Sequence, residues 1–174
     1  PVPPHPPTPP TARAPLSLKE RYTDVRERIA RAAARTERGA RRESDIILVA
    51  VTKFAEPDQI RELISLGHRD FGENKVQQLV QRAAVMDEWL GRQKSMPGAA
   101  RASIQGGAAT AGGVAGAGGG GVRWHMIGHL QRNKVRKALE ASRLIHSVDS
   151  LRVAEELQAV ANKRDQVVDI LVQV

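Results

Sequence analysis

A lysine directly follows a long apolar segment of the chain. Six apolar residues, Ile46 to Val51, lead through Thr52 to Lys53. A continuous apolar run is typical of a parallel strand covered on both faces, and α/β folds carry functional groups at the carboxyl ends of such strands. A partly desolvated lysine amine at that place can condense with an aldehyde to form a Schiff base. A lysine that only carries its charged head to water suits the same place, so this run alone leaves both interpretations open.

A second group of polar residues follows the next short apolar segment. Gly72 allows a ligand to approach the backbone closely, while Glu73 and Asn74 offer hydrogen-bonding side chains. These residues are therefore candidates for the same site as Lys53. Asn74 is equally suited to cap the helix that is expected to follow it.

Two histidines accompany the third apolar segment. His125 and His129 are four residues apart, which on a strand separates them by about 13 Å. The chain contains no H-E-x-x-H motif, so we expect no metal site. His125 is expected to face the interior of the fold. His129 is expected in the loop after the strand, together with Gln131 and Asn133.

Other polar residues near strand ends have ordinary structural explanations. Ser147 and Asp149 end the fourth apolar segment, where Asp149 or Ser150 can cap the next helix. The formal net charge of +8 permits contact with nucleic acid. One basic helix start could contact phosphates, but it lacks aromatic residues for base stacking, so a solvated helix face is favoured. Its basic residues are Arg132, Lys134, Arg136 and Lys137.

The elements that must position these residues alternate between strands and helices. Ser17 and Glu20 match a capping box and begin the first helix. The apolar patterns predict helices at 17–38, 57–66, 75–90, 132–142 and 150–164, and strands at 46–52, 68–74, 122–130, 143–149 and 167–174. This alternation predicts an α/β fold with a parallel sheet. Five strands cannot close a (β/α)₈ barrel, which takes about 250 residues, so either an open sheet or a C-terminally truncated barrel is expected.

Two segments of biased composition flank or interrupt the predicted fold. Eight of the ten prolines lie in residues 1–15, which predicts a disordered tail over 1–16. Nine of the fifteen glycines lie in 106–121, so 91–122 is interpreted as a flexible Gly/Ala-rich insertion in a surface loop. The chain has no cysteine, which excludes disulfides and thiolate chemistry. It has neither a membrane-spanning apolar run nor the apolar core of a signal peptide, and a cytoplasmic location is expected.

Five motifs in order carry a resemblance to a known family. They are "VAVTK", "DFGEN" followed by "VQ", "WHMIGHLQRNK", "LIHSVDS" and "LVQV". Together they resemble the pyridoxal phosphate homeostasis proteins, the YggS/PROSC family, over residues 17–174 apart from the insertion at 91–122. The resemblance implies the (β/α)₈ barrel of the N-terminal domain of alanine racemases, a TIM-barrel type of which this chain holds about five of the eight strands.

The resemblance also implies a cofactor and a function. Pyridoxal 5′-phosphate would be held as a Schiff base on Lys53, with Asn74, His125 and Asn133 matching motifs near the cofactor. Family members are regarded as carriers or buffers of this cofactor, with no established catalytic reaction. Possible recipients are apoenzymes that use pyridoxal phosphate, and a monomer is expected. The phosphate cradle of such barrels lies after strands seven and eight, so a chain complete at Val174 is expected to bind the cofactor weakly or not at all.

Two other functions stay open from the sequence. A pyridoxal-phosphate-dependent racemase of similar fold would need a second base opposite Lys53, supplied as tyrosine by a second domain. The only tyrosine is Tyr22, which is expected to be a packing residue. A nucleic-acid-binding module is the other alternative, and it predicts an affinity that falls steeply with salt.

Overall fold

Five parallel strands form the framework of the fold. The computed structural model describes residues 15–35, 42–95 and 121–174. Its sheet has the order β1-β2-β3-β4-β5, and every neighbouring pair is parallel. The strands are β1 Ala50–Val51, β2 Asp70–Glu73, β3 Arg123–Met126, β4 Ser142–Val148 and β5 Asp169–Val172. The predicted α/β fold with a five-stranded parallel sheet is confirmed.

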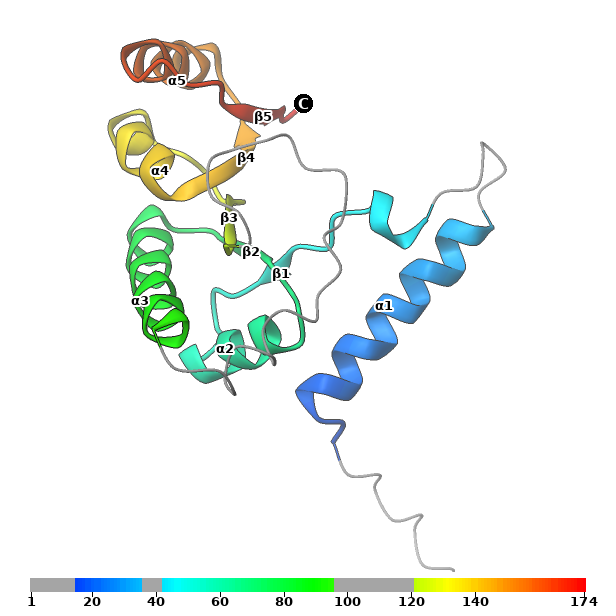
Figure 1. Ribbon diagram of the computed structural model, residues 1–174. Coiled ribbons are helices and arrows are strands. Elements are labelled where there is room, and N and C mark those ends of the chain that lie inside the picture. The colour runs from blue at the N-terminus through cyan, green and yellow to red at the C-terminus, as the bar shows by residue number, and fades with distance from the viewer. Residues whose placement is uncertain (1–14, 36–41, 96–120) are drawn as a thin grey trace, which may run out of the picture.

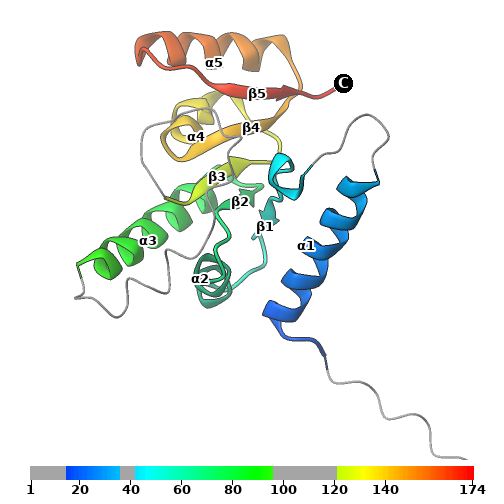
Figure 2. The same ribbon diagram turned by 45° about the vertical axis from the view of Figure 1, so that its right-hand side comes forward.

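The helices between the strands gather on one side of the sheet, while α1 lies beside its β1 end (Figure 1). A view turned by 45° keeps this arrangement (Figure 2). The helical elements are α1 Leu18–Ala34, η1 Glu43–Asp45, α2 Pro57–Ser65, α3 Val76–Lys94, η3 Arg132–Lys134, α4 Val135–Ala141 and α5 Leu151–Lys163. A doubly wound sheet reverses its strand order and carries helices on both faces. Sequential strands with helices on one face are instead the arrangement of a barrel wall.

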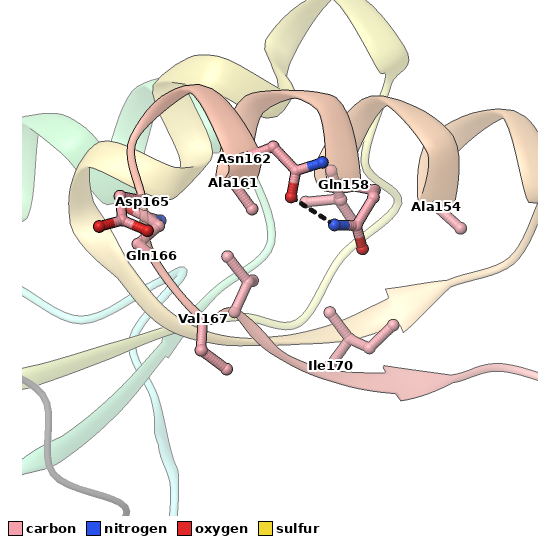
Figure 3. Close-up of a pocket in the computed structure, with 10 residues that line it drawn as sticks. Ala154, Gln158, Ala161, Asn162, Asp165, Gln166, Val167 and Ile170 are labelled. Atoms are coloured by element: carbon pink, nitrogen blue, oxygen red, sulfur yellow. Dashed lines mark hydrogen bonds between the residues drawn. The ribbon is translucent and has the colours of Figure 1, made fainter.

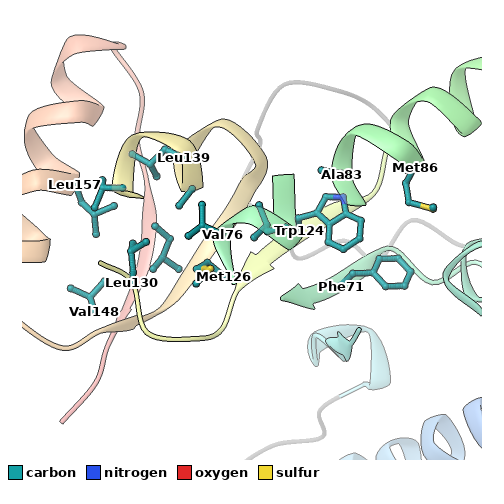
Figure 4. Packing of buried hydrophobic residues seen from close by; sticks show 14 of the residues in the cluster. Phe71, Val76, Ala83, Met86, Trp124, Met126, Leu130, Leu139, Val148 and Leu157 are labelled. Atoms are coloured by element: carbon teal, nitrogen blue, oxygen red, sulfur yellow. The ribbon is translucent and has the colours of Figure 1, made fainter. Parts of the chain in front are cut away.

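The hydrophobic core lies between the sheet and helices α2 to α5 (Figure 4). The strands contribute Phe71, Trp124 and Met126, and the helices contribute side chains such as Leu79 and Leu157, each at most 3% exposed. Burial of a side chain of this size stabilises the fold by about 1.5–3 kcal/mol. This core therefore fixes the strands whose ends carry the candidate residues.

Alternation along the strands assigns each residue to one of two faces. Phe71 faces the helices, so Glu73 shares its side of β2, whereas Asp70 and Gly72 lie on the opposite side. Val51 pairs in register with Gly72 and is 55% exposed. Among the described residues this opposite side is therefore only partly covered at Val51, and we call it the open face.

Strand β1 is shorter than predicted. The apolar run predicts a strand over 46–52, but only Ala50 and Val51 pair with β2. β1 is the end strand of the sheet, and η1 occupies the residues just before Ile46. The expectation that both faces of this run are covered is also wrong among the described residues, because Ile47 is 55% exposed. In the part of the chain that the structure describes, helices cover only one face of the sheet.

Local signals in the sequence appear at the helix ends. Ser17 and Glu20 form the predicted capping box before α1. Gly67 ends α2 with φ of 90°, a conformation that glycine adopts readily. α3 continues to Lys94, past the predicted end at residue 90, so the segment 91–122 begins as helix. Most of that segment, residues 96–120, and the tail at 1–14 lie outside the described residues.

Tyr22 connects α1 to the body of the fold. The His68 Nε2–H donates to the Asp70 carbonyl (2.7 Å), which leaves Nδ1 to accept from the Tyr22 hydroxyl (3.2 Å). Burial lowers the pKa of His68 and so favours the neutral ring that this pattern needs. Tyr22 is thus a packing residue, as predicted. In the described ranges, no helix is long and apolar enough to cross a membrane.

Candidate functional site

Lys53 lies at the carboxyl edge of the sheet, directly after β1. Its position is set by a turn in which the Ala55 N–H donates to the Thr52 carbonyl (2.8 Å). The side chain is exposed, and its Nζ lies 5.2 Å from the centre of the Phe54 ring. Within the described ranges Lys53 forms no ion pair. The amine is therefore open to a ligand that approaches this edge.

Asn74 follows β2 at the same edge, because the carboxyl ends of parallel strands lie together. The N-cap of α3 is Lys75, which makes no side-chain capping bond. The alternative interpretation of Asn74 as the helix cap is therefore wrong. Its side-chain oxygen is buried and has no hydrogen-bond partner among the described residues. Such an oxygen is costly unless a donor reaches it, which makes Asn74 a candidate for contact with a bound group.

Gly128 holds the loop after β3 against Asn74. A Cβ at Gly128 would stand 2.3 Å from the Asn74 carbonyl oxygen and 2.7 Å from its Cα, so only glycine fits without a shift. The same loop is fixed to the end of β4, because the Ser147 hydroxyl donates to the Gly128 carbonyl. His129 Nδ1 also lies 2.8 Å from a carboxylate oxygen of Asp149. The ends of β2, β3 and β4 are thus tied together.

A buried polar chain joins β1, β2 and α3 below Lys53. The Thr52 hydroxyl donates to Glu73 Oε1 (2.6 Å), and Arg82 Nε lies 3.1 Å from the same oxygen. Glu73 faces the helices and is fully buried. The sequence suggested Glu73 as a hydrogen-bonding residue of the site because it precedes Asn74. Its orientation toward the helices makes that interpretation wrong.

His125 belongs to a polar network on the open face. A carboxylate only accepts, so His125 Nε2–H donates to Asp70 Oδ1 (3.0 Å), and its Nδ1 lies 3.0 Å from His146 Nε2. Arg123 contacts both carboxylate oxygens of Asp70. Burial by itself would raise the pKa of Asp70, but the hydrogen bonds from His125 and Arg123 outweigh it and lower this pKa to about 2. Burial and then the charge of His125 lower the pKa of His146.

His125 lies on the open face, but closer to the amino end of the strands than Lys53. It pairs in register with Gly72, which pairs with Val51, and Lys53 lies two residues beyond Val51. The offset along the strands is therefore about 7 Å. Both ring nitrogens of His125 contact protein side chains, so it would influence a ligand at Lys53 through this network.

Asp70 should make the stability of the protein depend on pH in the acid range. Its pKa of about 2 in the fold lies below the usual 3.8, so the carboxylate stabilises the fold above about pH 4 and this contribution is lost as the pH falls through about 2. Urea unfolding over this range should show a smaller change in unfolding free energy for Asp70→Asn than for the parent protein. Equal changes in both proteins would contradict the assignment.

Comparisons with known proteins find relatives of this chain. The pyridoxal phosphate homeostasis protein of Aquifex aeolicus is 30% identical over 159 residues, covering 91% of this chain and 55% of that protein. The Escherichia coli protein of the same name is 30% identical over 157 residues, covering 90% and 54%. This chain is a relative of the pyridoxal phosphate homeostasis proteins. No family model matches it.

Solved structures support the same relationship. The structure of PipY from Synechococcus elongatus with pyridoxal phosphate bound has a TM-score of 0.55 and 28% identity, covering 86% of this chain and 54% of that one. The crystal structure of an unknown protein from Bifidobacterium adolescentis has a TM-score of 0.60 at 28% identity, covering 88% of this chain and 53% of that one. The chain spans about half the length of the homeostasis proteins and structures that it matches.

Asn133, the remaining site residue that resemblance to the homeostasis proteins indicated, lies apart from Lys53. It is exposed in η3, beyond β3 and two strands along the sheet from β1. With Gln131, Arg132 and Glu156 it lines an open pocket of about 470 Å³. A larger pocket of about 520 Å³ lies between α5 and β5, far along the sheet from β1 (Figure 3). Neither pocket includes Lys53 or Asn74.

The basic start of the helix after β3 is partly neutralised by acidic neighbours. Arg132 pairs with Glu156 (2.9 Å), and Arg136 lies 3.9 Å from Glu140. A solvated and paired helix face is therefore favoured over a surface for nucleic acid. Among the described residues, no group of three histidines or acids could hold a metal ion.

Proposed function

We propose that this chain binds pyridoxal 5′-phosphate covalently through Lys53. The observation that carries the proposal is the exposed Lys53 at the end of β1, together with an Asn74 side-chain oxygen at the end of the neighbouring strand β2 that has no partner among the described residues. Support comes from relatives that are named pyridoxal phosphate homeostasis proteins and from PipY, whose structure is described with the cofactor bound.

The residues at the edge fit such a group by their chemistry. The Lys53 amine can condense with the cofactor aldehyde, forming a carbon–nitrogen double bond and releasing one water. Asn74 offers an acceptor, and the side chains of Val51 on β1 and of Ile127, directly after β3, offer apolar surface. When bound, pyridoxal phosphate supplies an electron-withdrawing ring for amino-acid chemistry.

The proposed role is that of a carrier in vitamin B6 homeostasis and not of a catalyst. Racemisation needs a second base opposite the lysine. Among the described residues, Tyr22 is bonded to His68, and His125 has both ring nitrogens engaged. We further propose a cytoplasmic monomer that delivers the cofactor to apoenzymes that use it.

The test is to locate the covalent bond on the purified protein. After incubation with pyridoxal phosphate and reduction with borohydride, peptide mass mapping should place the adduct on Lys53. An adduct spread evenly over the exposed lysines would contradict the proposal. Turnover of an L-amino acid to its mirror image, dependent on Lys53, would contradict the carrier role.

A further inference from the structure

Thr52, Glu73 and Arg82 form a buried polar chain whose presence is not explained by packing of the hydrophobic core. Glu73 is 0% exposed and Thr52 is 1% exposed. Glu73 Oε1 receives both the Thr52 hydroxyl and Arg82 Nε, while its second carboxylate oxygen has no partner among the described residues. A buried ion pair of this kind is often no more stabilising than apolar residues of the same volume, so its position calls for a reason.

We propose that Thr52, Glu73 and Arg82 are positioning residues that hold the backbone of Lys53 in place for reaction with the cofactor. We call them the brace. This inference rests on the proposed function, because it assigns the brace to the same lysine. Lys53 itself is exposed, so its side chain is not fixed by packing. What can be fixed is the backbone from which the amine extends.

The hydrogen bonds around Thr52 show how the brace acts. The Thr52 N–H donates to the Gly72 carbonyl (3.0 Å), and its own carbonyl accepts from Ala55 N–H (2.8 Å). Its hydroxyl is held by Glu73 (2.6 Å). The residue before Lys53 is therefore bound through its backbone on both sides and through its side chain.

The brace matters because β1 is weak by itself. Only Ala50 and Val51 pair with β2, and Val51 is 55% exposed, so neither a long ladder nor deep burial fixes this strand end. Glu73, by contrast, is anchored twice. Its carbonyl accepts from Ile127 N–H (3.0 Å). Its carboxylate pairs with Arg82 on α3, and the Arg82 side chain is 21% exposed. The brace thus transfers the rigidity of β2, β3 and α3 to the strand end that carries Lys53.

The variants for a test are Thr52→Val, Thr52→Ser and Arg82→Met. Thr52→Val keeps the branched shape and removes the hydroxyl, whereas Thr52→Ser keeps the hydroxyl. Arg82→Met removes the cation but keeps a long side chain. Arg92→Met is the matched control, since Arg92 lies on the same helix in an exposed pair with Glu88 (2.5 Å) and is 75% exposed.

The first measurement needs no cofactor. Hydrogen exchange of the peptide covering residues 50–56 should quicken by about tenfold or more in Thr52→Val and Arg82→Met. Each variant removes one of the two polar contacts of the Glu73 carboxylate. Thr52→Ser and Arg92→Met should match the parent protein. Thermal unfolding separates this local change from a general loss of stability.

The second measurement is the rate at which pyridoxal phosphate forms its borohydride-reducible adduct on Lys53. It should fall by about tenfold in Thr52→Val and Arg82→Met and recover in Thr52→Ser. Exchange and adduct rates in Thr52→Val equal to those of Thr52→Ser would overturn the inference and leave the proposed function standing. A parent protein that forms no adduct on Lys53 would instead overturn the proposed function, while hydrogen exchange would still test the brace.

Discussion

Lys53→Ala is expected to abolish the covalent binding of pyridoxal phosphate. The amine of Lys53 is the group that we assign to the bond, and alanine offers no nucleophile. The visible absorbance of the protein-bound cofactor, and the mass added by borohydride reduction, should both disappear. Since the side chain is exposed and forms no ion pair among the described residues, unfolding free energy should change by no more than about 0.5 kcal/mol.

A neighbouring lysine is the matched control for this result. Lys75 is exposed next to Asn74 at the same edge of the sheet, so Lys75→Ala removes a similar charge without removing the proposed nucleophile. It should keep the absorbance and the added mass. If Lys53→Ala kept both signals while Lys75→Ala lost them, the assignment of the anchor to Lys53 would be wrong.

The sequence predicts the framework well because the core depends on local patterns. Apolar spacing on the helices and apolar runs in the strands are sufficient to order the elements from α1 to β5. The strand at 46–52 is predicted too long, since a run of apolar residues marks a potential strand but a ladder also needs a partner. Only Ala50 and Val51 have one, and this partner is set by the whole sheet.

The site is predicted less completely because its contacts join distant residues. The apolar run and its position identify Lys53, but Asp70 meets His125 across 55 positions of sequence. The pairing of Glu73 with Arg82 also could not be predicted from the sequence, since no motif links these two residues. One available signal was the alternation in β2, which assigns Glu73 to the face of Phe71, opposite to the open face.

Gly128→Ala is expected to damage both the fold and the site. The added methyl group would meet the Asn74 carbonyl oxygen at 2.3 Å, and backbone on both sides must move to make room. Such overpacking typically costs about 1–3 kcal/mol of unfolding free energy. The required shift displaces Asn74, so the adduct on Lys53 should also form more slowly. Chemical unfolding and the borohydride assay measure the two effects on the same preparation.

Gly91→Ala separates this contact from the general effect of changing glycine to alanine. Gly91 lies in α3, and a Cβ there would meet nothing within 4 Å. Alanine should therefore stabilise the helix by about 0.5–1 kcal/mol, which raises the melting temperature by about 2–4 °C per kcal/mol in a protein of this size. The two substitutions should thus shift stability in opposite directions, and only Gly128→Ala should slow the adduct. Equal and harmless effects would mean that the loop after β3 does not press on Asn74 in solution, and Gly128 would then have no part in positioning Asn74.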